Sequence, residues 1–442
     1  MEVPPHDPQS FAFLGAATTL VVVYALVVTE LVNRAVVAVL GAGVLIALGV
    51  LTQQQAIAAV DFNTIGLLVG MMIMVAVGRK SGLFGYVAVK AAQAARGSPS
   101  GILFSLALVT AVLSAFLNNV TTILLVVPVT LLVCGQLKVP VYPFLFAEVF
   151  ASNIGGTATL IGDPPNIMIG SAAHLSFDAF LTNIAPIVIV ILAAQFAVNH
   201  LIWGRRLRAN AEDRADIMAL KAGEAIEDRR LLRWSVGIIA VTILAFAFED
   251  QLGLQAATIA MFGGALMLLI ENVPLAHSEH ARNVTSALNE IEWITIFFFL
   301  GLFIVVGAVE HAGVLAWLGR HLLAVTGGDT RLAASGTLWA SAVLSAIVDN
   351  IPFVATMIPL IKTLAPHFGG EAAIQPVWWS LALGACLGGN GTLVGASPNL
   401  VAAGLAERAG VEFSFWKFTA LAFPLMLGSI ALCQIYLWWR YF

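Results

Sequence analysis

The chain has 442 residues, of which 60% are hydrophobic and 10% charged, and its mean hydropathy is +0.94. Soluble domains carry about 25% charged residues, so this chain has too few charges to cover a water-facing surface, which excludes most soluble enzymes. The formal net charge of −4 provides no basic surface for nucleic acid. The composition therefore predicts an all-α protein that crosses a lipid bilayer several times.

The apolar segments fall into two kinds. A membrane-spanning helix needs about 20 mostly apolar residues, and uninterrupted segments of this kind occur at 11–29, 35–51, 62–78, 179–203, 234–248, 254–270, 293–309 and 418–437. Polar or helix-breaking residues interrupt four more, at 101–134, 142–173, 331–366 and 376–404. We predict that the first and third of these four are re-entrant hairpins and that the others are broken helices, which gives about ten crossings.

A charged segment, 204–233, divides the chain into a first half (residues 1–203) and a second half (residues 234–442) and reads as a solvated linker. Five crossings in each half give the halves opposite orientations. Most of the 21 Lys and Arg residues then lie on the linker side, and this excess of positive charge predicts a cytoplasmic linker with both termini outside. The acidic N-terminus lacks the basic region of a cleavable signal peptide. We expect an integral protein of the cell (plasma or inner) membrane.

The two halves share a sequence pattern. NIGGTATLIGDPPN (153–166) and CLGGNGTLVGASPN (386–399) are identical at seven of fourteen positions, and SAFLNNVTTILLVVPV (114–129) aligns with SAIVDNIPFVATMIPL (345–360). Two pairs of glycines follow the same spacing, Gly70 with Gly301 and Gly82 with Gly313. Inverted repeats with interrupted helices recur in secondary transporters, whose binding sites lie at the interruptions near the middle of the membrane.

The polar residues at the two hairpin tips and the two helix breaks are the candidate substrate- and ion-binding residues. Uncharged amides and hydroxyls dominate, and opened helix ends add backbone N–H and C=O groups. Such a lining suits a small hydroxylated or anionic solute, or a cation such as Na⁺. The candidates are Asn118, Asn119, Thr122, Thr157, Thr159, Asp163, Asn166, Asp349, Asn350, Asn390, Thr392, Ser397 and Asn399.

The carboxylates differ between the halves, because Asp163 aligns with Ala396 and Asp349 aligns with Asn118. An ionised Asp at the centre of a spanning helix costs about 2.5–3.5 kcal/mol on insertion scales, so each must be neutral or paired. We predict Asp163 and Asp349 as proton- or cation-coupling groups, with Glu148 as a further candidate. The alternative is that these acids only hydrogen-bond the opened backbone.

These motifs resemble the ion transporter superfamily, and more narrowly the branch with ArsB-type arsenite/antimonite efflux pumps, NhaD-type Na⁺/H⁺ antiporters and the melanocyte P protein. The motifs are FLNNVTTILLVVPV, NIGGTATLIGDPPN, DNIP and GGNGTLVGASPN, and the resemblance covers nearly the whole chain. It implies an elevator-type transporter in which hairpins and broken helices move against a scaffold. Dicarboxylate and citrate relatives usually have Ser-Asn-Thr tips and an uncharged residue before Pro-Pro-Asn, where this chain has Asp163.

The leading hypothesis is efflux of arsenite or antimonite coupled to proton entry. The first alternative is a Na⁺(Li⁺)/H⁺ antiporter, followed by transport of an anion, a dicarboxylate or another small solute. No P-loop motif occurs, so we expect no ATP-driven step in this chain and no cofactor or metal centre. The resemblance implies that the protein could form a homodimer, and that it could recruit a partner arsenite ATPase; the sequence decides neither point.

Two other classes of function fit the sequence less well. An intramembrane aspartyl protease would have a Gly-x-Gly-Asp box, whereas this chain has LIGD at 160–163, and that class leaves the inverted repeat unexplained. We therefore expect no enzyme. A passive channel would be distinguished by rapid flux that is independent of the pH gradient.

Overall fold

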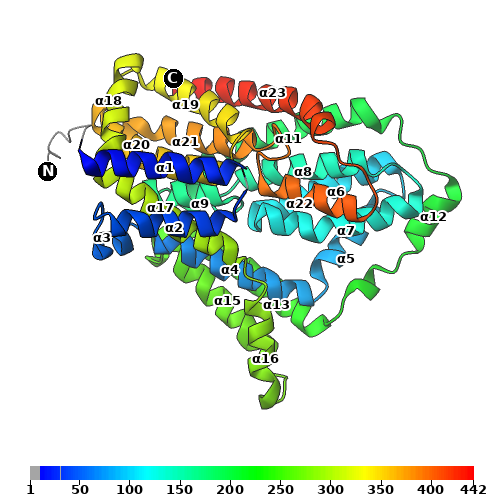
Figure 1. Ribbon diagram of the computed structural model, residues 1–442. Helices are drawn as coiled ribbons and strands as arrows, with labels where there is room; N and C mark the ends of the chain where they lie inside the picture. Colours follow the sequence, from blue (N-terminus) through cyan, green and yellow to red (C-terminus); the bar gives the residue numbers. More distant parts are fainter. Residues whose placement is uncertain (1–9, 30) are drawn as a thin grey trace.

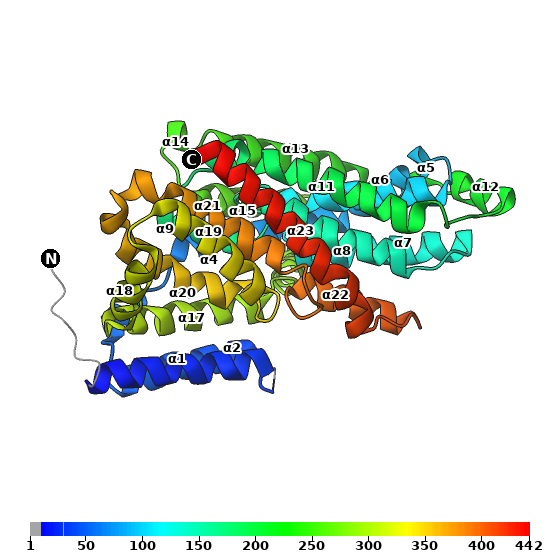
Figure 2. The same ribbon diagram turned by 90° about the horizontal axis from the view of Figure 1, so that it is seen from above.

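The computed structural model describes residues 10–29 and 31–442, and within them the chain forms helices and no β-strand. Nine helices in this part are long and apolar enough to cross a membrane, by length and composition (Figures 1 and 2). They are α1 (Phe11–Thr29), α4 (Phe62–Lys80), α6 (Pro99–Phe116), α7 (Asn119–Leu137), α11 (Ala185–Asn199, continued by a π-helical turn, His200–Gly204), α13 (Arg229–Ala247), α17 (Trp293–His311), α20 (Asn350–Leu364, continued by a 3₁₀ turn, Ala365–Phe368) and α23 (Phe415–Tyr441). The all-α membrane architecture is confirmed, while residues 1–9, at the terminus expected outside, lie beyond the described residues.

Both predicted hairpins are present. The first consists of α6 and α7, which meet at the non-helical Leu117 and Asn118. The second consists of α19 (Thr330–Ser345) and α20, which meet at residues 346–349. In Figure 1 the two hairpins extend toward opposite ends of the molecule, and their tips lie near its middle.

Both predicted helix breaks are present as well. The first separates α8 (Tyr142–Thr157) from α9 (Pro164–Ala173), and the second separates α21 (Glu371–Gly388) from α22 (Ser397–Arg408). Each later helix begins with a proline in its first two positions, where the missing N–H costs nothing and the fixed φ suits a helix start. Pro-Pro and Ser-Pro therefore restart the helix after each break.

The equivalent glycines of the two halves lie at equivalent helix crossings. The shorter apolar helix α2 (Arg34–Ala47) packs on α17, and α15 (Ala256–Asn272) packs on α4. A Cβ atom on Gly301 would lie 2.4 Å from the carbonyl carbon of Ala38, and a Cβ on Gly70 would lie 2.4 Å from that of Ala260. Each crossing therefore needs glycine, and each joins a helix of one half to a helix of the other.

The second glycine pair starts two equivalent helices. Gly82 precedes α5 (Leu83–Ala94) with φ 81°, and Gly313 precedes α18 (Val314–Thr326) with φ 78°. Left-handed backbone of this kind favours glycine because it has no Cβ. The repeat in the sequence is thus a repeat in backbone geometry.

The hairpins and broken helices pack together across the two halves. Within each half the first hairpin helix packs on the helix before the break, α6 on α8 and α19 on α21. Between the halves α9 packs on α20 and α22 packs on α7. We call α6–α9 together with α19–α22 the hairpin unit, and α1, α2, α4, α13, α15 and α17 the frame.

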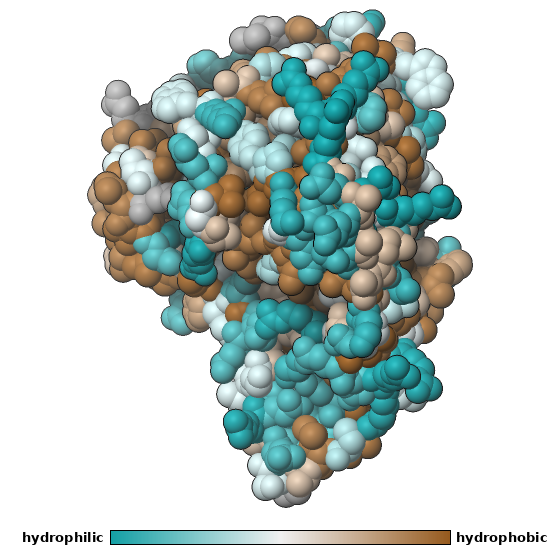
Figure 3. Space-filling model, turned by 90° about the vertical axis from the view of Figure 1, so that its right-hand side faces the viewer, coloured by the Kyte–Doolittle hydropathy of each residue, from teal (hydrophilic) through white to brown (hydrophobic). Residues whose placement is uncertain are grey.

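Short helices complete the chain, and part of the predicted solvated linker is docked. Residues 229–233 form the first turn of α13, Ile217 is fully buried, and the Asp213 carboxylate accepts a hydrogen bond of 2.7 Å from Lys138 at the end of α7. Hydrophilic side chains gather on this end of the molecule (Figure 3). The remaining short helices are α3 (Gln53–Ala58), α10 (Phe177–Asn183), α12 (Ala211–Ala219), the 3₁₀ turn Ala222–Ala225, α14 (Glu249–Leu252) and α16 (His277–Leu288).

Candidate transport site

The hairpin tips reverse the chain at capping residues. Asn118 Oδ1 accepts a hydrogen bond of 2.8 Å from the backbone N–H of Val120, and Asp349 Oδ1 accepts one of 3.4 Å from that of Ile351. Short polar side chains at this position satisfy the free N–H groups of a first helical turn. The positive ends of the α7 and α20 dipoles therefore point toward the middle of the protein.

The two tips and the first break meet at one narrow cavity. Its polar lining consists of three carboxylates, three amides, one guanidinium and two hydroxyls, which we call the polar cluster. The members are Asp163, Asp349, Glu292, Asn118, Asn119, Asn350, Arg34, Thr295 and Ser397. Six of these nine were predicted from the sequence, and the structure brings residues of both halves together.

Asp163 is 1% exposed and lies in extended backbone immediately before α9. Asn350 of the other half places its amide nitrogen 3.4 and 3.5 Å from the two carboxylate oxygens. A buried carboxylate is costly unless it is paired and well hydrogen-bonded, and these contacts are long. The position therefore suits a carboxyl group that binds and releases a proton or a cation.

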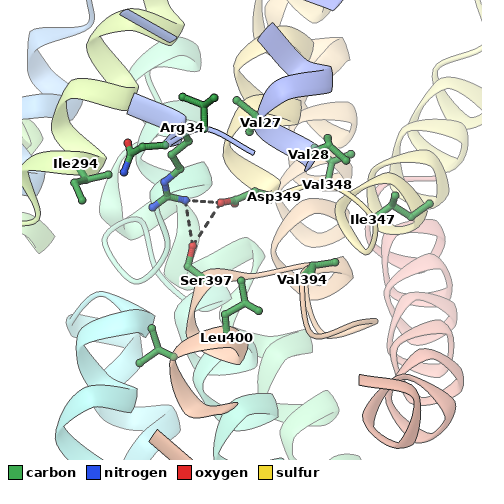
Figure 4. A pocket seen from close by; sticks show the side chains of 13 residues that line it. Val27, Val28, Arg34, Ile294, Ile347, Val348, Asp349, Val394, Ser397 and Leu400 are labelled. Carbon is green, nitrogen blue, oxygen red and sulfur yellow. Dashed lines mark hydrogen bonds and ion pairs between the residues drawn. The ribbon is translucent and has the colours of Figure 1, made fainter. Parts of the chain in front are cut away.

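Asp349 has a charged partner that the sequence did not reveal. Arg34, the first residue of α2, places Nη1 2.7 Å from Asp349 Oδ2 and 3.3 Å from Ser397 Oγ (Figure 4). In the sequence Arg34 is one of the basic residues on the linker side of the predicted topology. It is a charged residue between two apolar segments, but its contact with a residue 315 positions later has no local signal.

Asn153 is a second residue that the sequence did not single out. It is fully buried in α8, and its amide nitrogen donates hydrogen bonds of 2.9 Å to Asn390 and to Asn399 of the second break. Its amide oxygen lies 3.4 Å from the amide nitrogen of Asn119. Asn153 thus joins the two breaks and the first hairpin tip. Asn153 aligns with Cys386 in the repeat, and this difference between the halves is the signal that could have identified Asn153 from the sequence.

Several predicted residues bind backbone rather than line the cavity. Thr159 donates to the carbonyl of Ala115, and Thr392 donates to that of Ala346 at 2.6 Å. In each break the repeated asparagine donates to the carbonyl of this threonine, Asn166 at 2.9 Å and Asn399 at 2.8 Å. These identical residues fix each break against its hairpin, whereas Asp163, Asp349 and Ser397, which differ from their equivalents in the other half, line the cavity.

Three other predicted residues lie outside the polar cluster. The hydroxyls of Thr122 and Thr157 donate to carbonyls one turn earlier in the chain, those of Asn118 and Asn153. Glu148 is buried between α7 and α8, where Thr130 donates to one carboxylate oxygen and the other has no hydrogen-bond partner in the described part of the chain.

A wider cavity of about 400 Å³ adjoins the polar cluster and shares Arg34, Asp349 and Ser397 with it. Figure 4 shows these three side chains converging at one end, with apolar side chains around them. The apolar walls come from the frame (Val27, Val28 and Ile294), from Val32 between α1 and α2, and from the hairpin unit (Ile347, Val348, Val394, Leu400 and Val401). The cavity therefore lies between the two units and ends at the ion pair.

Comparisons with known proteins agree with this architecture. The family model described as citrate transporter (CitMHS) matches residues 24–384. An uncharacterised transporter of Mycobacterium tuberculosis is 44% identical over 431 residues, covering 97% of this chain and 98% of that protein. The P protein of Homo sapiens is 34% identical over 506 residues, covering 96% of this chain and 59% of that protein.

The YdaH transporter of Alcanivorax borkumensis has a similar fold, with a TM-score of 0.61 and 14% identity over 86% of each chain. The predicted superfamily is confirmed and includes the P protein among the relatives, whereas the ArsB and NhaD types stay predictions. The chain belongs to the citrate transporter (CitMHS) family of the ion transporter superfamily and is an integral membrane transporter.

Proposed function

We propose that this chain is a proton-coupled secondary transporter that exports arsenite or antimonite, with Asp163 and Asp349 as the coupling acids. The observation that carries the proposal is that these two carboxylates, one from each half, line one cavity together with amides of both hairpin tips. Each charge that crosses a potential of 100 mV supplies about 2.3 kcal/mol, which sustains about a fifty-fold accumulation.

The charge of the polar cluster supports a cargo that is not an anion. Three carboxylates, those of Asp163, Asp349 and Glu292, face a single guanidinium, that of Arg34. A polyanion such as the citrate in the family description would add negative charge to a site with an excess of it, at a high cost in a poorly solvated cavity. A neutral solute or a monovalent cation adds no such cost.

The amides suit a neutral hydroxylated cargo. Arsenite is mostly As(OH)₃ at neutral pH, and its hydroxyls can donate to carboxylates and accept from amides such as those of Asn118, Asn119 and Asn350. Tight capture by a thiolate would oppose release. Cys386, beside the second break, is fully buried and its thiol contacts Asn166 Oδ1 at 3.4 Å. Hydrogen bonds therefore carry the proposed recognition.

A Na⁺(Li⁺)/H⁺ antiporter is the second candidate, and the excess of carboxylates favours it. Carboxylate and amide oxygens are hard ligands suited to hard cations, so Asp163 and Asp349 would bind Na⁺ and protons in turn. Transport of a dicarboxylate or another anion is the third candidate, and only the family description supports it.

The proposal includes an orientation and a setting. The linker is placed in the cytoplasm and both termini outside, in the cell (plasma or inner) membrane, with residues 1–203 and 234–442 as the two inverted halves. A homodimer is proposed on the resemblance alone. The proton gradient is the energy source, so a partner ATPase would add to transport rather than permit it.

Purified protein in proteoliposomes tests the proposal. An imposed pH gradient is expected to drive arsenite accumulation by the wild type and to fail in Asp163→Asn, while the exposed-acid control Asp178→Asn behaves as the wild type. Na⁺ and citrate are tested in parallel. Accumulation of Na⁺ but not arsenite would replace the first candidate by the second, and citrate accumulation would refute the charge argument.

A further inference from the structure

The guanidinium of Arg34 contacts both the frame and the hairpin unit. On the frame side Nη2 lies 3.2 Å from the hydroxyl of Thr295, and the guanidinium carbon lies 5.3 Å from the ring centre of Phe298, both in α17. On the other side Nη1 contacts Asp349 and Ser397 at 2.7 and 3.3 Å. The Arg34–Asp349 ion pair is therefore a charged link between the two units.

Arg34 is held firmly by the frame. The α2–α17 crossing is close enough that Gly301 admits no Cβ beside Ala38, one helical turn from Arg34. The hydroxyl of Thr295 also contacts a carboxylate oxygen of Glu292 at 3.2 Å. Movement of the hairpin unit against the frame would thus separate Asp349 from Arg34 rather than carry the guanidinium along.

The equivalent crossing, that of α15 with α4, has a threonine–acid contact like that of Thr295 with Glu292. Thr64 and Asp61 align with Thr295 and Glu292, and the Thr64 hydroxyl donates to Asp61 at 2.6 Å. Because Ala260 occupies the place of Ala38 at its crossing, the residue equivalent to Arg34 is Ala256. The other half therefore has the threonine and the acid but no guanidinium.

The hairpin unit shows the same asymmetry. Asp349 corresponds to the uncharged Asn118, and Ser397 corresponds to Pro164. All three members of the Arg34–Asp349–Ser397 group are thus absent from the pseudo-symmetric position. A contact needed only to hold the fold together would be expected in both halves, as it is for Thr159 and Thr392.

We propose that Arg34 is a tethered counter-cation that holds the hairpin unit against the frame while Asp349 is ionised and empty, so that a proton or cargo on Asp349 releases the unit. This rests on the proposed function, because it assumes transport by relative movement of the two units. A neutral hydroxylated cargo that donates to Asp349 competes with Arg34 for the same oxygen. The ion pair would therefore prevent movement of the unloaded carrier, which is the step that would dissipate the proton gradient.

The other charged groups that face the ion pair are Asp163 and Glu292, both of which line the same cavity. Each is a carboxylate that competes with Asp349 for Arg34. The experiment therefore includes Asp163→Asn and Glu292→Gln, which should retain the wild-type close fraction if Asp349 is the group that holds Arg34.

Paired nitroxide labels measure the position of the hairpin unit without any cargo. The labels are placed with Val28→Cys in α1 and Ile347→Cys at the second hairpin, two exposed residues on opposite walls of the wider cavity. The native residues Cys134, Cys386 and Cys433 are buried and do not compete for the label. Dipolar broadening reports the fraction of molecules in which the two walls are close.

In the wild type the close fraction should be about threefold or more above that of the two variants that remove the ion pair. Arg34→Gln and Asp349→Asn should therefore both show a low close fraction. Arg34→Lys should show a close fraction between those of the wild type and Arg34→Gln. An ammonium can pair with Asp349 but cannot also reach Thr295 and Ser397, as the planar guanidinium does.

Arg79→Gln is the matched control, because Arg79 pairs with Glu290 at 2.5 Å outside the polar cluster, and it should behave as the wild type. In transport, Arg34→Gln should lower accumulation against a gradient about tenfold while it changes downhill exchange much less.

A wild-type close fraction in Arg34→Gln would overturn the proposal. So would a low close fraction in Asp163→Asn together with a wild-type close fraction in Asp349→Asn. If no cargo is transported but the label results are as expected, the proposed cargo is wrong while the role of Arg34 stands. If arsenite is exported but Arg34→Gln keeps full coupling, the role of Arg34 is wrong and the proposed function stands.

Discussion

Alanine at the two equivalent glycines should destabilise the protein equally and impair transport unequally. A Cβ on Gly301 would lie 2.4 Å from the carbonyl carbon of Ala38, and a Cβ on Gly70 would lie 2.4 Å from that of Ala260. Carbon atoms in contact are about 3.5–4.0 Å apart. The two helices must therefore separate by about 1 Å or more in either variant.

Overpacking of this kind costs about 1–3 kcal/mol, and the matching distances predict similar losses for Gly301→Ala and Gly70→Ala. Gly43→Ala is the control, because Gly43 lies in α2 and a Cβ there meets no atom within 4 Å. Alanine is favoured over glycine in a helix by about 0.8–1.0 kcal/mol. The control should therefore be as stable as the wild type or more stable.

The effect on transport should differ because only one crossing carries the ion pair. In Gly301→Ala the displacement of α2 moves Arg34 away from Thr295 and Asp349. In Gly70→Ala the displaced helix, α15, has Ala256 at the position of Arg34. Coupled transport should thus fall further in Gly301→Ala than in Gly70→Ala.

Thermal unfolding in detergent and accumulation in proteoliposomes measure the two effects. The expected result is a similar fall in Tm for both glycine variants, no fall for Gly43→Ala, and a larger loss of accumulation in Gly301→Ala. A wild-type Tm for Gly301→Ala would refute the packing argument. Equal loss of transport in both variants would refute the link to Arg34.

Three further predictions concern residues outside the glycine crossings. Asn153→Leu removes two hydrogen bonds of 2.9 Å and leaves two buried acceptors unpaired, so it should lower the free energy of unfolding by about 2–4 kcal/mol and abolish transport; a wild-type Tm would contradict this. Thr159→Val and Thr392→Val should each cost about 1–2 kcal/mol in the same assay, and a large effect of only one would contradict their equivalence. The hydrogen bond from Lys138 to Asp213 and the negative charge of Asp213 raise the pKa of Lys138. The contact should therefore be complete at pH values below the ordinary pKa of lysine and be lost as the pH rises through the raised pKa. Proteolysis of residues 211–219 should therefore accelerate at high pH, and at neutral pH in Lys138→Met; equal rates in the variant and the wild type would contradict this.

The sequence predicted the architecture because the same pattern of residues occurs in both halves of the chain. Identical residues such as Gly155 and Gly388 occupy positions where a Cβ would meet a backbone carbonyl oxygen, that of Ala111 or that of Ala342, at 2.1 or 2.5 Å. Such steric demands recur in each half and are visible as a repeat. They explain why the hairpins and the breaks could be placed without a structure.

The site was predicted less completely because its chemistry depends on contacts between distant elements. Thr159 and Asn166 were expected to face the solute because they are polar and repeated, yet they bind the backbone of the break. Arg34 and Asn153 join elements more than 200 residues apart, and neither contact leaves a local pattern. Residues of both kinds line the site: Asp163, Asp349 and Ser397 differ from their equivalents, whereas Asn119 and Asn350 match.

Proton movement driven by cargo tests the central claim most directly. Proteoliposomes that contain the wild type and an internal pH dye should change their internal pH when arsenite is added on one side, and the Asp178→Asn control should do the same. Asp163→Asn and Asp349→Asn should show no such change, while arsenite still equilibrates down its gradient. Arsenite-driven proton movement of wild-type size in both variants, or none in the wild type, would contradict the account.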